Sequence, residues 1–307
     1  MAQAFFDDNQ VSIFKTYRIT DEQINALRAC IEGQQAVDNI VNTLTQYPSN
    51  AQSSVELQQR LCGLWTLLND RAVGIPTAQP TIISILQTIQ TLPWAEIPED
   101  EDRDDFDFDD GYYWRELSWW PSDWADKQNC KDDPRYHPTL KLANIEFTDY
   151  FSNYTLEKYS PNEYSKRRAS CISANMYTAR LAATGDETLA MQGAALDRAG
   201  SIAMNDFLKK EEERIDSGCV EAAAQLFIYA AREMFCLIRG DPDAEDVHSQ
   251  RTQSGQSLMK RKDKPIDGDQ WRLFRKRWEE FAEMESLPTE TRVAAQKALE
   301  AMHQVHV

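Results

Sequence analysis

Carboxylates and large aromatic rings follow one another in a single stretch of this sequence, and both can take part in chemistry. Ten of the fifteen residues from Glu96 to Asp110 are acidic. An unpaired carboxylate loses its hydration when it is buried, so we expect residues 96–111 to form an acidic loop in water. The rings that follow have large apolar areas and favour burial; they are Tyr112, Tyr113, Trp114, Trp119, Trp120 and Trp124.

These rings could form the wall of a pocket for an apolar substrate, because binding sites are lined mainly by apolar and aromatic side chains. Packing as core is the alternative, and it is the commoner outcome for aromatic residues at helical spacing. The candidate substrate-binding residues are Tyr113, Trp114, Trp119, Trp120 and Trp124, together with Tyr150 and Met176 on two later predicted helices.

Three polar residues on the predicted helices of the second half are candidate catalytic residues. Asn175 lies on a face of small apolar residues, where its amide could orient a substrate carbonyl or tie two helices together. Arg180 could clamp a carboxylate or enolate, or pair with Glu146 or Asp149 of the preceding helix. Glu146 could act as a general acid or base if it is buried, and otherwise forms a surface ion pair.

The acidic run also invites comparison with class I terpene cyclases, which are helical and bind a diphosphate through magnesium. Magnesium takes carboxylate oxygens as ligands, but one or two well-placed carboxylates suffice. Lys209 stands where the second motif of those enzymes has serine or threonine, which weakens the match. The matching positions are Asp104, Asp105, Asp107 and Asp109 for the first motif, and Asn205, Asp206 and Glu213 for the second.

Composition excludes several other classes. The net charge of −17 argues against nucleic-acid binding, which needs a basic surface. No apolar run approaches the roughly 20 residues that span a bilayer. Six scattered cysteines and an N-terminus without a secretory pattern indicate a cytoplasmic protein with reduced thiols. The four histidines form no metal-ligand pattern, and nucleotide-binding motifs are absent, so we expect neither a metal nor a cofactor.

Helical signals dominate the elements that must position these residues. Glycine and proline are sparse, at 11 and 12 residues, and no stretch has convincing strand periodicity. We therefore expect one all-α domain over residues 1–307, with about nine or ten helices and a long, partly basic loop at 240–268. The clearest predicted helices cover residues 20–47, 53–70, 81–92, 139–159, 160–184, 186–215, 220–235, 271–281 and 293–302, with a partly helical stretch at 111–128 that breaks at Pro121.

The order of several short motifs resembles that of a known family. The stretch from Ile172 to Gly185, which reads ISANMYTARLAATG, is similar to a signature of a fungal family of all-helical proteins known only as a domain of unknown function. The resemblance covers roughly residues 60–302. Three further pieces agree in order and spacing: Tyr113 to Leu117, Ala222 to Gln225 with the Gly240–Pro242 turn, and Trp271 to Phe281 with the segments at 290–292 and 301–302.

This resemblance implies an all-α fold and supplies no catalytic motif. Members of the family are frequent neighbours of specialised-metabolite biosynthetic genes, which favours a small-molecule enzyme. We therefore predict a cofactor-independent cyclase or isomerase, such as an intramolecular Diels–Alder cyclase, that binds an apolar metabolite between helices. A non-enzymatic helical interaction or carrier protein is the second hypothesis, and a magnesium-dependent terpene cyclase is the third. The sequence does not give the oligomeric state.

Overall fold

The computed structural model describes residues 19–129, 160–197, 199–200, 217–239 and 268–305. These residues form α-helices and short 3-10 turns and contain no strand, which confirms the all-α prediction. Nine α-helices have both ends within the described residues, and none of them is long and apolar enough to cross a membrane. The chain divides into two compact units, Met1–Asp149 and Tyr150–Val307, and the prediction of a single domain stays a prediction.

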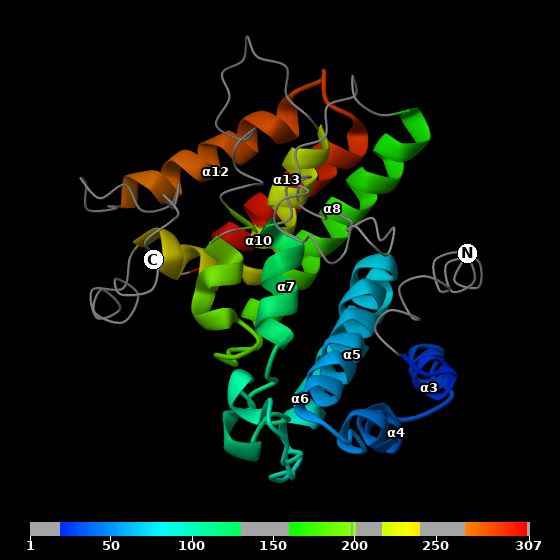
Figure 1. Ribbon diagram of the computed structural model, residues 1–307. Coiled ribbons are helices and arrows are strands. Elements are labelled where there is room, and N and C mark those ends of the chain that lie inside the picture. The colour runs from blue at the N-terminus through cyan, green and yellow to red at the C-terminus, as the bar shows by residue number, and fades with distance from the viewer. Residues whose placement is uncertain (1–18, 130–159, 198, 201–216, 240–267, 306–307) are drawn as a thin grey trace. The chain divides into compact units, whose positions relative to one another are not determined.

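The first unit is built around α5 (Ser54–Gly74), which packs against α4 (Val37–Ser49), α6 (Gln79–Gln90) and α7 (Trp120–Asn129) (Figure 1). The Ser53 side chain caps the start of α5, as serine favours. Leucines at three- and four-residue spacing then form one apolar face of α5, which is buried in the core of the unit. Leu57, Leu61, Leu64, Trp65 and Leu68 are all 0–1% exposed.

The helix predicted over residues 20–47 is two helices, so that prediction is wrong in its middle. A capping box between Thr20 and Gln23 opens α3 (Asp21–Ile31), as predicted. Gly33 then takes a left-handed conformation with φ of +73°, which suits glycine and ends the helix. α4 begins four residues later and packs against α3.

The second unit has α10 (Ser217–Arg239) at its centre, packed against α8 (Pro161–Ala182), α12 (Gly268–Glu283) and α13 (Thr289–Gln304) (Figure 1). Three consecutive alanines at 222–224 are fully buried, so neighbouring helices can approach α10 closely. Phe227 of α10 contacts Trp271, Phe274 and Trp278 of α12, with ring centroids 5.5–6.0 Å apart. The aromatic seam that the sequence predicts on α12 is therefore core.

Two irregular points of the second unit were not predicted. Ala230 has non-helical dihedral angles (φ −141°, ψ 40°) and interrupts α10, although the helix interior has no proline there. Residues 187–190, in a stretch predicted to be helical, form turns that lead to the 3-10 helix Met191–Gly193.

In the first unit Pro121, predicted to break a helix, instead lies in the first turn of α7, where proline is tolerated.

Several predicted features lie outside the described residues. These are Glu146, Tyr150, the predicted helix at 139–159, residues 240–267 of the basic loop, and the second motif of the terpene-cyclase hypothesis at 205–213.

Candidate functional site

The acidic segment at 96–111 is held to the first unit at defined points. Eight of its ten acids are exposed, in line with the expected hydration, but Ile97 and Phe108 are buried and anchor the chain. Asp100 accepts a hydrogen bond from the backbone amide of Ser54, at the start of α5. Asp109 accepts one from the hydroxyl of Ser118. The segment is therefore a fixed acidic surface with short 3-10 turns at Arg103–Asp105 and Asp109–Gly111.

Most of the aromatic residues that follow are core. Trp65 of α5 meets Trp114 edge to face with ring centroids 6.1 Å apart, and Trp114 in turn contacts Tyr113 at 5.0 Å. Such contacts are typical of packed aromatic clusters. Tyr113, Trp114, Trp120 and Trp124 are 0–3% exposed, Trp119 is half-buried against Phe106, and Tyr112 is 46% exposed. These four buried rings therefore pack as core, the alternative that their helical spacing favoured, and a role in substrate binding stays a prediction.

Polar contacts fix these rings in one arrangement. The indole of Trp120 donates to Asn69 Oδ1 at 3.2 Å, and Asn69 Nδ2 donates to Asp123 at 2.8 Å. The indole of Trp65 donates to the carbonyl of Ser118 at 2.8 Å. Asn69 is fully buried, so these bonds satisfy polar groups that have no water.

Burial also determines the chemistry of two groups in this unit. It raises the pKa of the Tyr113 phenol, and hydrogen bonds with Ser49 and Trp114 oppose that shift. Burial likewise raises the pKa of the Cys30 thiol. Both groups are therefore neutral at physiological pH, and neither has the lowered pKa of an activated nucleophile.

Two of the predicted polar residues, Asn175 and Arg180, lie on α8 in the second unit and differ in burial and in their contacts. Asn175 is fully buried; its Nδ2 donates to the carbonyl of Cys171 on the same helix at 2.9 Å. Its Oδ1 has no hydrogen-bond donor in the described part of the chain. The amide does not tie α8 to a neighbour through a described hydrogen bond. Met176 and Arg180, one turn apart, are both half-buried.

Arg180 in the last turn of α8 lies against Tyr229 of α10. Its guanidinium carbon is 4.4 Å from the centre of the Tyr229 ring, within the range of a cation–π contact. Tyr229 directly precedes Ala230, where α10 is interrupted. No described side chain or carbonyl accepts a hydrogen bond from Arg180, and its Nε is buried without an acceptor.

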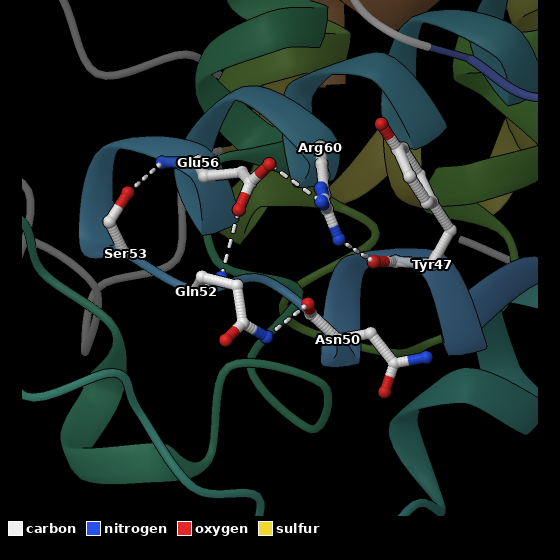
Figure 2. A network of polar contacts seen from close by, with 6 residues as sticks. All are labelled: Tyr47, Asn50, Gln52, Ser53, Glu56 and Arg60. Atoms are coloured by element: carbon white, nitrogen blue, oxygen red, sulfur yellow. Dashed lines mark hydrogen bonds and ion pairs between the residues drawn. The ribbon is translucent and has the colours of Figure 1, made fainter.

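Two other arginines also lie over aromatic rings, and their terminal nitrogens form hydrogen bonds or ion pairs as well. Arg60 lies over the ring of Tyr47 at 4.0 Å, with its terminal nitrogens bonded to Glu56 and to the carbonyl of Tyr47, both at 2.6 Å (Figure 2). Arg277 lies over Phe281 at 4.4 Å and pairs with Glu280 at 2.7 Å. Arg180 has the ring but no carboxylate among the described residues.

A buried carboxylate that the sequence analysis did not single out joins three helices of this unit. Glu221 of α10 is 7% exposed and accepts hydrogen bonds from Arg168 of α8 and, at 2.6 Å, from the hydroxyl of Thr291 of α13. The signal in the sequence is a single acid directly before three alanines in an apolar helix. Tyr229 was also missed, because nothing in its neighbours marks it as the partner of Arg180.

The structure brings only some of the candidate residues together. Asn175, Met176 and Arg180 share α8, whereas the five candidate aromatic residues belong to the first unit. Among the described residues, no three histidine, cysteine, aspartate or glutamate side chains form a group that could hold a metal ion.

Comparison with known proteins gives one result. No curated protein and no solved structure matches the chain. A family model described as "Protein of unknown function (DUF3632)" matches residues 65–280, and the chain therefore belongs to this family.

Proposed function

We propose that this chain is a cofactor-independent cyclase or isomerase in which Arg180 binds the polar group of an otherwise apolar small molecule. The observation that carries the proposal is the half-buried guanidinium of Arg180, which lies over Tyr229 and has no described carboxylate or carbonyl partner. A charge in that position attracts a carbonyl oxygen or an anion. Hydrogen bonding to a carbonyl polarises it and lowers the barrier to cyclisation.

Such a reaction needs little more than orientation. Holding a flexible substrate in one folded conformer supplies several kcal/mol of the barrier without metal or cofactor. In this proposal Met176, one turn before Arg180, offers apolar contact, and Asn175 Oδ1 accepts a hydrogen bond from the substrate. Trp119, the half-buried ring of the candidate set, belongs to the first unit, and its role in substrate binding is a separate proposal. Glu146 and Tyr150 keep their proposed roles as general acid or base and as apolar contact.

The substrate class rests on the resemblance to fungal proteins whose genes neighbour specialised-metabolite genes. We propose an apolar specialised metabolite on that basis, and a cytoplasmic reaction because the scattered cysteines suit a reducing compartment.

The experiment compares metabolites of a source strain with and without this gene. Purified protein is then added, with EDTA and without cofactor, to the intermediate that accumulates. We expect conversion by the wild type, loss of conversion in Arg180→Ala with the fold intact, and normal conversion in the control Arg232→Ala, which changes an exposed arginine of α10. An intermediate that stays unchanged with folded protein would count against the enzyme. Unfolding of Arg180→Ala would make Arg180 a structural residue.

A helical interaction or carrier protein is the second candidate. It is favoured by Trp94 and Tyr112, which are 55% and 46% exposed beside the exposed acids of the first unit. Aromatic residues are enriched in the surfaces through which proteins contact partners. The terpene-cyclase hypothesis is third, and magnesium-dependent binding of inorganic diphosphate to the protein would support it.

A further inference from the structure

Arg180 differs from the arginines of the two other described arginine–ring pairs because its terminal nitrogens have no hydrogen-bond acceptor among the described residues. Arg60 also has a buried Nε without an acceptor, but both of its terminal nitrogens are bonded. Arg277 has a carboxylate partner. At Arg180 no hydrogen bond from the guanidinium to a described residue is formed, and the guanidinium carbon lies 4.4 Å from the centre of the Tyr229 ring. The terminal N–H donors of the guanidinium thus have no acceptor among the described residues.

These donors select a particular chemistry. Two parallel N–H donors match the two oxygens of a carboxylate, or of an enolate with a neighbouring carbonyl, and bind them bidentately. A single neutral carbonyl uses only one of the donors. Contact with the Tyr229 ring restricts the guanidinium, so less side-chain entropy is lost when the anion binds.

Tyr229 is the last residue of α10 before the helix is interrupted. Ala230 leaves the helical path directly after Tyr229 and is itself 1% exposed, so the break is packed inside the unit. The ring that lies against Arg180 is therefore next to a buried break in the helix. Tyr229 acts through Arg180 and is a positioning residue.

We propose that the ligand of Arg180 is a planar organic anion, a carboxylate or enolate with an apolar body, and that Tyr229 positions the guanidinium for it. This inference deepens the proposed function and rests on it for the statement that the ligand is a substrate.

Binding is measured with sorbate, a conjugated six-carbon carboxylate, and with its neutral amide as the matched probe. The ¹⁵N–¹H signal of Arg180 Nε is assigned by its absence in Arg180→Lys and is followed during titration of the full-length protein. We expect sorbate to shift this signal saturably, the amide to leave it in place, and the Nε signal of Arg60 to stay unchanged. A signal that does not move at tens of millimolar sorbate, or that moves equally with the amide, overturns the proposal.

Variants of Tyr229 test the positioning role. Tyr229→Phe keeps the ring and should keep sorbate affinity, whereas Tyr229→Leu should weaken it about threefold to tenfold. If Tyr229→Leu does not fold, Tyr229→Met replaces it as the test, because methionine also removes the ring while it keeps an apolar side chain and leaves the Arg180 Nε signal to follow. Equal affinity in the folded variants would remove the positioning role.

The outcomes also separate this inference from the proposed function. Sorbate binding without conversion of the accumulated intermediate would sustain the anion site and overturn the enzyme. Conversion of the intermediate without sorbate binding would sustain the enzyme and overturn the anion site.

Discussion

The indole of Trp94 covers the backbone of Gly111 so closely that a methyl group on residue 111 would lie 2.2 Å from Trp94 Nε1. The same nitrogen donates to the carbonyl of Asp110 at 2.9 Å. The amide of Ala95 donates to the carbonyl of Gly111, also at 2.9 Å. These contacts close the acidic segment at both ends, so a run of exposed acids is held in one shape.

Replacement of Gly111 by alanine should therefore destabilise the first unit strongly. Gly111 has a φ of +93°, which disfavours any side chain, and the new methyl group would also clash with Trp94 and with the carbonyl of Ala95. We expect a loss of more than about 2 kcal/mol in the free energy of unfolding, measured in urea.

Gly33→Ala is the matched control for Gly111→Ala. Gly33 has a φ of +73° in the same unit but no atom within 4 Å of the added methyl group. It should lose only about 1 kcal/mol, the cost of the backbone conformation alone. Equal losses in the two variants would show that the Trp94 contact contributes nothing.

Local signals in the sequence account for much of the fold. Ser160 and Pro161 mark the start of α8, and Gly185 follows its end as a left-handed glycine. The periodic leucines of α5 and the aromatic seam of α12 both mark faces that are buried. These features are local because capping, periodicity and glycine conformation depend on a few neighbouring residues.

The candidate site was less predictable because it depends on contacts between distant segments. Arg180 was singled out as a cation on a helix, but its partner Tyr229 is 49 residues away and has no distinctive neighbours. The break at Ala230 has no glycine or proline to announce it. The acidic run was predicted to be a solvated loop, whereas buried Ile97 and Phe108 fix it to the unit. Tertiary packing decides each of these points.

Trp120 offers a test of whether the aromatic residues serve stability or binding. Trp120 is fully buried and donates its indole N–H to Asn69. Trp120→Phe removes that bond and part of the ring, so we expect a loss of about 1–3 kcal/mol in the free energy of unfolding. The intermediate should still be converted at temperatures well below the melting midpoint. Trp94→Phe, at a 55% exposed position, is the control and should lose less stability. A raised KM with unchanged stability would instead make Trp120 part of a substrate pocket.

The cysteines should differ in reactivity because burial raises the pKa of Cys30, whereas Cys236 is exposed. The thiolate is the reactive form, so iodoacetamide at pH 8 should modify Cys30 at least about tenfold more slowly than Cys236. Mass spectrometry of digested protein resolves the two sites.

The pH dependence of stability at Cys30 follows from the same shift. The unfolded thiol ionises at a lower pH than the folded one. The stabilisation due to the neutral thiol is thus complete below the unfolded pKa and is lost as pH rises through the folded pKa. Cys30→Ala should remove this dependence. Equal alkylation rates at Cys30 and Cys236 in the folded protein would contradict the burial of Cys30.

Glu221 should contribute more to the second unit than an exposed ion pair does, because it joins α8, α10 and α13 through Arg168 and Thr291. Glu221→Gln removes the charge that Arg168 needs, and we expect a loss of about 2–3 kcal/mol in the free energy of unfolding, since Arg168 is partly exposed. Thr291→Val should lose about 1 kcal/mol, the value of one hydrogen bond. A double-mutant cycle with Arg168→Met isolates the ion pair.

Glu280→Gln is the control for Glu221→Gln. It breaks the pair with Arg277, in which the carboxylate is more exposed, and should change stability by less than about 1 kcal/mol. Because Glu221 fixes α8 on α10, Glu221→Gln should also lower any activity that depends on Arg180. If Glu221→Gln is no more destabilising than Glu280→Gln, the three-helix contact does not hold the unit together.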